Sequence, residues 1–563
     1  MSFVSPEGGL SRIGSSRPLH YLILIVLGAM MLLPGCAKLP LIDRDEPRFA
    51  EATHEMLQRG NFIIPYFNGE YRFDKPVMTY WLMMGSFSFF GNQLELAARF
   101  HSILASILVA LCVYEFARSW LTISSGILGG VIWLTSLQTL IHGRVAVADM
   151  PMIFAVALCH LALYQLIATK QKRFGFWFWA LYPGLAFGLL AKGPVALACP
   201  LLTLLLFRFA LWRKPFDLRR LQIISGGILC LLIVAAWGVP ALMETHGAFW
   251  QIGMQEHVID RGLETFNSRV FLPFYYFLTV FPSLFPWSAF LVGIYFLLRK
   301  EWNQTNAFLL AWAAAPYLIF LFYKTQLPHY VMPAFPALAL LLAQSFRHRP
   351  SRAEWVNITF LFVATLLLAG MLLLIAGGET FPEKMLPVRD MLPLLAGFFL
   401  MMFAGALLVR MRGLSAGPVL LFIAGGAVVW PVAENIREIS PVVALTDSFH
   451  KMPAGTEYID FGFSEPTLTY YSGGIWKHLE MAPDSESIAR PGPHFFIFQR
   501  SEQRVEDYVK WRLFSKKSES SQDYLSPENE RRLRQAGYRV VHVWGVNTAR
   551  MSWVELDGWF RTF

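Results

Sequence analysis

Three Asp-x-Pro triplets are the residues in this chain best suited to chemistry: Asp45-Glu-Pro47, Asp74-Lys-Pro76 and Asp149-Met-Pro151. Taken alone, each is typical of an ordinary helix start, with Asp as the cap and Pro in the first turn. On one side of a membrane, however, they would gather three helix N-termini, several carboxylates and Lys75. Helix N-termini attract anions, and a carboxylate beside a cation supplies a base and an electrostatic clamp. The pattern predicts chemistry on a phosphate-bearing substrate.

Further polar residues flank the apolar segments. A Lys at the end of a membrane span, such as Lys192, is usually an anchor that reaches for the lipid headgroups. Lys75 and Arg261 lie within loops, where that explanation does not apply, so we expect them to meet a phosphate. The other candidates are Glu256 and His257 beside Arg261, and Lys324, His329 and Tyr330 at a predicted helix start.

The composition indicates what must position these residues. Of 563 residues, 55% are hydrophobic and only 15% are charged, with a mean hydropathy of +0.44. A soluble domain carries about 25% charged residues, and apolar runs long enough to cross a bilayer recur along this chain. The fold class is therefore an all-α polytopic membrane protein in a lipid bilayer. The net charge of +9 follows from basic loops rather than from nucleic-acid binding.

About thirteen transmembrane helices are predicted. If the N-terminus is cytoplasmic, the basic residues fall in the cytoplasmic loops at 170–173, 208–220, 299–300, 347–352 and 410–412, as the positive-inside rule requires. All three Asp-x-Pro triplets and the C-terminus then lie on the outer face. The predicted spans are 20–38, 99–117, 122–142, 151–169, 175–191, 194–211, 221–242, 273–298, 306–323, 327–346, 355–376, 391–409 and 417–433.

Two domains are predicted: a membrane domain over 1–445 and a small outer α/β domain over 446–563. The first outer loop, 39–98, holds two juxtamembrane helices joined by an extended pair that turns at Asn68-Gly69. In the tail, short β-type runs alternate with helical stretches, one of which begins after Ser526 and stops at Gly537.

The five cysteines show no disulfide or metal-site spacing. The stretch around Cys36 loosely resembles a lipoprotein cleavage box, and cleavage there would remove the first span. We expect residues 20–38 to be retained as a helix.

A cluster of cations and helix starts at the bilayer surface suits a lipid-linked phosphate. A prenyl chain would lie between spans, its phosphate would meet Lys75 and Arg261, and an Asp would deprotonate or orient an acceptor. The residues alone do not name the substrate.

The order of several stretches resembles a known family. DEPRFAEATHEML, NGEYRFDKPVMTYWL, FGNQLELAARFHS, RVAVADMP, AKGPVAL and LPHYVMPAFPALALL together resemble the GT-C glycosyltransferases of the protein O-mannosyltransferase type. They are most similar to bacterial transferases that move 4-amino-4-deoxy-L-arabinose from undecaprenyl phosphate to lipid A. The resemblance covers nearly the whole chain. It implies a GT-C fold in the bacterial inner membrane, an active site and C-terminus in the periplasm, and transfer with inversion.

The resemblance also implies roles for residues of the first loop. The Asp of the family's Asp-Glu-x-Arg motif falls on Asp45, rather than on Asp43, as the base or the residue that positions the acceptor. Glu46 and Arg48 complete this motif, Glu46 as a further catalytic carboxylate and Arg48 as a residue that positions the acceptor. The family's Phe-Glu-Lys-Pro corresponds to residues 73–76, so Lys75 takes the phosphate-binding role.

The remaining correspondences lie in later loops. Asp149 matches the acidic residue of the second outer loop, and Lys192 matches the Lys of the Lys-Gly-Pro element. The family's Glu-His-x-x-Arg is one residue longer here and ends at Arg261. Its Lys-Leu-Pro-x-Tyr ends at Tyr330 but begins with Gln326, the nearest lysine being Lys324. Both departures touch the donor site and leave the sugar open.

A cofactor is not required by these residues. A divalent metal held by His257 and Asp74 is the alternative, weakened by the shorter Asp74 side chain where the family has Glu. Two other functions stay open. One is transfer of another sugar, such as a hexose, from polyprenyl phosphate to a protein, a glycan or another lipid. The other is a transporter of lipid-linked sugars, although transporters gather charge at the bilayer midplane rather than in outer loops.

Overall fold

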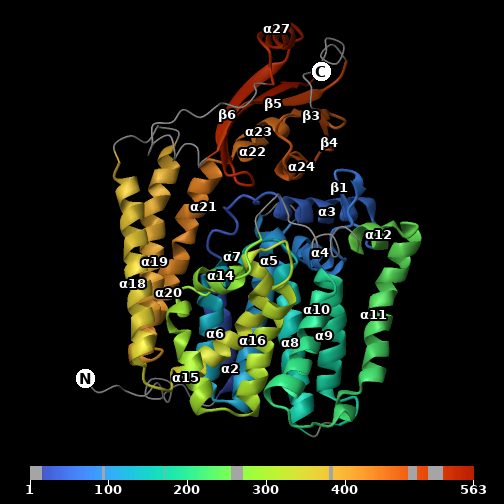
Figure 1. Cartoon of the computed structure of the whole chain (residues 1–563). Coiled ribbons are helices and arrows are strands. Elements are labelled where there is room, and N and C mark those ends of the chain that lie inside the picture. The colour runs from blue at the N-terminus through green and yellow to red at the C-terminus, as the bar shows by residue number, and fades with distance from the viewer. Residues whose placement is uncertain are drawn as a thin grey trace.

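A helical bundle with a small sheet domain at one end makes up the computed structural model (Figure 1). The structure describes residues 16–91, 95–169, 172–254, 271–378, 385–479, 491–504 and 524–562. His257 and Arg261 lie outside these residues, so the expectations placed on them stay predictions.

The bundle confirms a polytopic helical membrane protein. Within the described ranges, six helical segments are long and apolar enough to cross a membrane, and a bent pair would make a seventh. Shorter apolar helices accompany them, so the predicted total of thirteen stays a prediction. The six segments are α5 (Glu95–Trp120), α8 (Asp149–Ala168), η2 with α11 (Leu218–Glu244), α18 (Arg352–Ala376), α19 (Leu386–Arg412) and α20 with α21 (Ala416–Glu438).

Other helices fill the spaces between these segments. They are α2 (Arg17–Leu32), α6 (Ile123–Thr135), α7 (Leu137–His142), α9 (Phe176–Lys192), α10 (Val195–Leu205), α12 (Ala248–Met254), α16 (Gln304–Phe320), η6 (Pro328–Ala334) and α17 (Phe335–Ser345). Cys36 is buried just beyond α2, and its thiol donates to the Leu32 carbonyl at 2.9 Å.

Two predicted spans are wrong as continuous helices; the span 122–142 is interrupted at Ser136, where the backbone is extended between α6 and α7. The span 273–298 is broken between α14 (Tyr275–Ser283) and the segment Trp287–Lys300, which holds η5 (Trp287–Phe290) and α15 (Val292–Lys300), with a bend of 114°. Pro282 and Pro286 explain the break, since each lacks an amide hydrogen and Pro286 disfavours helical geometry in the residue before it. The apolar run is uninterrupted in sequence, so hydropathy alone does not reveal the break.

The outer loop has the predicted elements. α3 (Asp45–Arg59) crosses the end of the bundle beneath the sheet domain (Figure 1) and ends at Gly60, whose φ is +63°. β1 (Tyr66–Phe67) and β2 (Glu70–Tyr71) form the hairpin at Asn68-Gly69, and α4 (Met78–Phe90) follows. The residues at the N-cap positions of α3, α4 and α8 are Arg44, Val77 and Ala148, and none makes a side-chain cap. Asp45 and Asp149 are instead the first helical residues of α3 and α8, so the interpretation of these two as N-caps is wrong.

The C-terminal domain is the predicted small α/β domain. Its five strands run in the order β4-β3-β5-β7-β6, with β3, β4 and β5 parallel and β7 antiparallel to both β5 and β6. α22 (Pro441–Ala444), α23 (Thr446–Phe449) and α24 (Pro466–Ser472) pack on one face, and α27 (Pro527–Gln535) covers the other. The predicted boundary at residue 446 stays a prediction. The strands are β3 (Glu457–Phe461), β4 (Trp476–Leu479), β5 (His494–Arg504), β6 (Arg539–Asn547) and β7 (Ser552–Arg561).

Candidate active site

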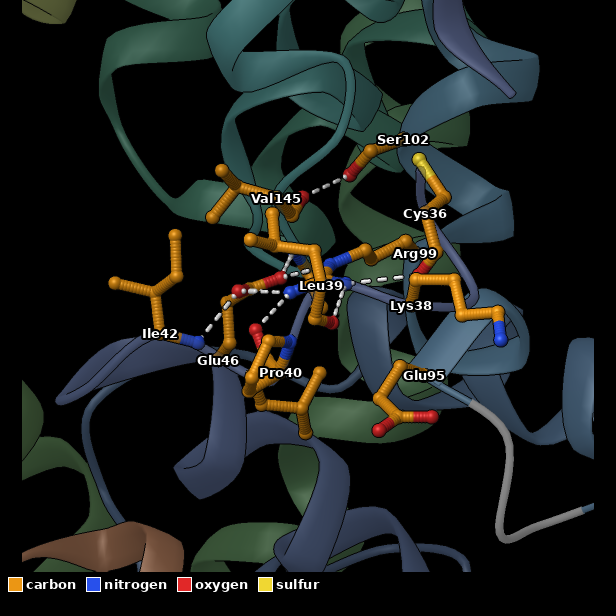
Figure 2. A network of polar contacts seen from close by, with 12 residues as sticks. Cys36, Lys38, Leu39, Pro40, Ile42, Glu46, Glu95, Arg99, Ser102 and Val145 are labelled. Carbon is orange, nitrogen blue, oxygen red and sulfur yellow. Dashed lines mark hydrogen bonds and ion pairs between the residues drawn. The ribbon is translucent and has the colours of Figure 1, made fainter. Parts of the chain in front are cut away.

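Glu46 and Arg99 form a buried ion pair beneath the start of α3 (Figure 2). The guanidinium donates from Nε to Glu46 Oε1 at 2.8 Å and from Nη2 to Oε2 at 2.7 Å. Its remaining hydrogens reach the carbonyls of Cys36, Leu39 and Pro40. A planar guanidinium suits this two-bond geometry. The arrangement wraps residues 36–40 around a fixed charge.

Glu46 also receives two backbone amides, from Ile42 at 2.8 Å and from Ala146 at 2.7 Å. Each of its carboxylate oxygens therefore accepts two hydrogen bonds. All of these donors are buried or backbone groups, so this carboxylate is poorly placed to take a proton from an acceptor. The geometry therefore favours a positioning role for Glu46 over the predicted catalytic role. Ala146 lies three residues before Asp149, so Glu46 ties the start of α3 to the loop that leads into α8.

Asp45 has different surroundings from its neighbour. It is the first residue of α3, it is exposed, and no hydrogen bond or ion pair joins it to another residue in the described part of the chain. Arg48 and Arg72 lie near enough to interact electrostatically with it. Burial and the neighbouring Arg72 lower the pKa of Arg48, and Asp45 and Asp74 oppose that shift. Asp45 is thus an accessible carboxylate at a helix N-terminus beside two cations.

Arg72 joins the second triplet to this group. Its Nη2 lies 2.9 Å from Asp74 Oδ2, its Nε donates to the Tyr80 hydroxyl at 3.0 Å, and its side chain is buried. Lys75 Nζ donates to the Asp74 carbonyl at 2.9 Å. Arg72 was missed from the sequence, although a cation two residues before Asp74 is the signal that could have identified it. We call Asp45, Arg48, Arg72, Asp74 and Lys75 the first-loop cluster.

The third triplet lies in a second group, which we call the α8 cluster: Asp149, Lys192, Tyr330, His142 and His329. Lys192 Nζ bonds to Asp149 Oδ1, and His329 Nε2 lies 3.8 Å from the same oxygen. Lys192 also lies over the Tyr330 ring, 5.7 Å from its centre, and the rings of His142 and His329 are 4.6 Å apart. The structure thus brings together four residues named from the sequence: Asp149, Lys192, His329 and Tyr330. His142 was missed, because a lone His in an apolar stretch carries no signal.

Some predictions find no support in this geometry. Lys324 is exposed and makes no hydrogen bond or ion pair with any residue that the structure describes. Asp74 is paired with Arg72, and within the described ranges no group of three His, Cys, Asp or Glu residues could hold a metal ion. The proposed metal site at Asp74 and His257 stays a prediction, because His257 lies outside those ranges.

An apolar cavity of about 320 Å³ lies between α4, α5, α8 and α9. Its wall includes Pro151, in the first turn of α8, which begins at Asp149. The other lining residues are mostly apolar and include Leu82, Phe89, Leu104, Phe154 and Phe187. The described site therefore combines charged helix starts with a neighbouring space suited to hydrocarbon.

Comparison with known proteins finds a matching family, named relatives and similar solved structures. Residues 41–251 match the family described as dolichyl-phosphate-mannose-protein mannosyltransferase. Two relatives carry the name undecaprenyl phosphate-alpha-4-amino-4-deoxy-L-arabinose arabinosyl transferase. The protein from Enterobacter sp. (strain 638) is 32% identical over 62% of this chain and 64% of its own length. The protein from Edwardsiella ictaluri is 32% identical over 57% of this chain and 58% of its own length. The chain thus spans less than two thirds of either relative.

Among solved structures, ArnT from Cupriavidus metallidurans bound to undecaprenyl phosphate is similar, with a TM-score of 0.70 at 16% identity. The similarity covers 96% of this chain and 97% of that one. At this level of identity it shows a common fold over nearly the whole chain. The partial family match, the named relatives and this common fold agree with the resemblance seen in the sequence motifs.

Proposed function

We propose that this protein is a membrane glycosyltransferase that moves a sugar from undecaprenyl phosphate to an acceptor on the outer face of its membrane. The sugar that fits best is 4-amino-4-deoxy-L-arabinose, as in the names of the relatives, and the acceptor is lipid A, as the resemblance of the sequence motifs implies. The observation that carries the proposal is the exposed Asp45 at a helix start beside Arg48 and Arg72. A carboxylate beside fixed positive charge suits transfer in which a phosphate leaves.

The transfer would form one bond and break one. The acceptor oxygen bonds to the anomeric carbon from the face opposite the phosphate, and the bond from that carbon to the phosphate oxygen breaks. The electron pair leaves with undecaprenyl phosphate, whose added charge is offset by Lys75 and Arg72. If the acceptor is a hydroxyl, its proton passes to Asp45. If it is a lipid A phosphate, the oxygen is already anionic and Asp45 only orients the acceptor.

The α8 cluster and its neighbouring cavity supply the lipid-binding part of the proposal. Lys192 has its charge partly offset by Asp149 and lies over the Tyr330 ring, so it is held in place while still able to meet a second anionic oxygen. The cavity beside Pro151 offers an apolar path for the prenyl chain. A prenyl chain held there would bring its phosphate to the outer ends of α8 and α9.

The proposed location is the bacterial inner membrane, with the site and the C-terminal domain in the periplasm. Two observations support this orientation. The Lys and Arg residues of the predicted inner loops outnumber those of the outer loops. The sheet domain, α3 and α4 share one end of the bundle (Figure 1).

The test is a defined reaction in detergent or proteoliposomes. Purified protein is given lipid A and undecaprenyl-phosphate aminoarabinose, and both lipids are followed by mass spectrometry. We expect one product sugar on lipid A for each undecaprenyl phosphate released. Activity with a hexose donor alone would move the proposal to another sugar, and donor crossing the bilayer without release of undecaprenyl phosphate would indicate a transporter.

A further inference from the structure

The C-terminal domain contacts the two residues that directly precede Asp45. Asp43 Oδ1 accepts from the Thr467 amide at 3.0 Å, and Asp43 Oδ2 accepts from the Thr467 hydroxyl at 2.8 Å. Thr467 lies in the first turn of α24, on the side of the sheet domain that faces α3. A single side chain of the first loop is thus held at both oxygens by a residue 424 positions away.

Arg44 makes the second contact. Its Nε lies 3.3 Å from Glu465 Oε2, and the Glu465 side chain is fully buried. The other oxygen of Glu465 accepts from Arg550 Nε and from Asn547 Nδ2, each at 3.0 Å. Asn547 is the last residue of β6, so this carboxylate is anchored to the sheet. The sheet domain therefore offers Arg44 a fixed anion rather than a mobile surface side chain.

A third contact holds the segment slightly earlier in the chain. The Leu41 amide donates to the Tyr471 hydroxyl at 3.1 Å, and that hydroxyl lies 3.3 Å from Glu95 Oε1. Residues 41–44 are therefore held by α24 on one side. On the other side, Glu46 accepts a hydrogen bond from the Ile42 amide, and Arg99 donates one to the Pro40 carbonyl (Figure 2).

These contacts take the place of a side-chain cap at the start of α3. The N-cap residue Arg44 makes no side-chain cap, and its backbone is helical rather than extended. A first turn without a cap has unsatisfied amides and frays readily. The position of Asp45 in that turn therefore depends on what holds residues 43 and 44.

We propose that the C-terminal domain positions Asp45, with Thr467 acting through Asp43 and Glu465 acting through Arg44. Neither residue touches the reacting atoms, so both are positioning residues. The inference rests on the proposed glycosyl transfer and assigns to the C-terminal domain a part in that reaction. A small displacement of a reacting group lowers the rate by up to about 10²-fold.

The alternative is that these contacts only join two domains. In that case their loss would lower the stability of the protein, and the protein that stays folded would keep its turnover rate. The two accounts therefore differ in kcat measured on folded protein, not in yield or melting temperature.

The experiment compares Thr467→Val and Glu465→Gln with the full-length wild-type protein. Each is purified as the monodisperse fraction, and kcat and the donor KM are measured with undecaprenyl-phosphate aminoarabinose and lipid A. We expect kcat to fall by about tenfold or more, with the donor KM changed less than about twofold. Thr467→Ser, which keeps the hydroxyl, should restore kcat. Arg532→Gln, on the exposed side of α27, is the matched control and should leave both constants unchanged.

Hydrogen exchange of the peptide 39–52 provides a readout that does not need activity. Thr467→Val and Glu465→Gln should raise its exchange rate, while Arg532→Gln should not. Normal kcat in both variants, or unchanged exchange in this peptide, would overturn the positioning role. If the wild-type protein shows no transfer but exchange rises as expected, the proposed reaction fails while the domain contact stands.

Discussion

Glu46 and Arg99 hold each other through two hydrogen bonds of 2.8 and 2.7 Å, in a place where neither side chain reaches solvent. The pair ties the start of α3 to residues 36–40 and, through the Ala146 amide, to the loop before Asp149. One buried ion pair therefore relates two of the three Asp-x-Pro carboxylates that the sequence marked for chemistry, Asp45 and Asp149.

Breaking this pair should destabilise the protein strongly. Arg99→Met leaves Glu46 charged, buried and without its partner, and loss of one member of a buried pair lowers stability by about 3–5 kcal/mol. The double variant Glu46→Leu with Arg99→Met removes both charges and should be less destabilised than Arg99→Met alone. Thermal unfolding in detergent checks both expectations, and an unchanged melting temperature for Arg99→Met would contradict this description of the pair.

Replacing Asp45 separates its two proposed parts. Asp45→Asn keeps a polar side chain of the same shape but cannot take a proton, so with a hydroxyl acceptor turnover should fall by about 10²–10⁴-fold. Melting temperature should not change, because Asp45 is exposed and makes no hydrogen bond among the described residues. Initial rates of undecaprenyl phosphate release measure the effect, and near-normal turnover would exclude Asp45 as the base.

Two of the lysines named from the sequence, Lys192 and Lys324, should behave differently in donor binding. Lys192→Gln removes the partner of Asp149 and a cation of the α8 cluster. The donor KM should therefore rise by about tenfold, which corresponds to the loss of one hydrogen bond to a charged group. Lys324→Gln should change little, since Lys324 is exposed and outside both clusters. Donor titrations at saturating acceptor decide between them. The reverse order of effects would show that the donor phosphate binds near Lys324.

The contact between Asp43 and α24 should depend on pH. Burial and the nearby Glu465 raise the pKa of Asp43 to about 7, against the opposing effects of Thr467 and Arg48. A raised pKa means that folding favours the protonated form. The stabilisation is therefore complete below the ordinary pKa of 3.8 and is lost as pH rises through about 7. Arg44 also faces this region, where it pairs with Glu465.

Melting temperatures between pH 5 and pH 8 test this dependence. The wild-type protein should lose more stability with rising pH than Asp43→Asn, whose amide does not titrate. Parallel curves for the two proteins would mean that Asp43 does not titrate in this range.

Much of the fold could be predicted because long apolar runs and turn residues are local signals. The helix ending at Gly60, the hairpin at Asn68-Gly69 and the helix after Ser526 were all predicted from such signals. The break between Ser283 and Trp287 was not, because the run around it is apolar throughout and only its two prolines mark the break.

The candidate site, like the fold, could be predicted from the sequence only in part. The side of the membrane on which each triplet falls follows from counting spans, so Asp149 and Lys192 could be expected near each other. The pairing of Glu46 with Arg99, 53 residues away, and of Asp43 with Thr467 depends on packing between distant segments. The spacing of residues in the sequence does not indicate such contacts. For this reason Glu46 was predicted to be catalytic, like its neighbour Asp45.

The central claim is sugar transfer from undecaprenyl phosphate, and one reaction tests it most directly. Purified protein, lipid A and undecaprenyl-phosphate aminoarabinose are incubated together, and the lipids are identified and quantified by mass spectrometry. A parallel reaction with Asp45→Ala is the control. The proposal predicts lipid A carrying an added aminopentose and an equal amount of free undecaprenyl phosphate, with less of both products in the control. Intact donor and unmodified lipid A in the presence of folded wild-type protein would contradict it.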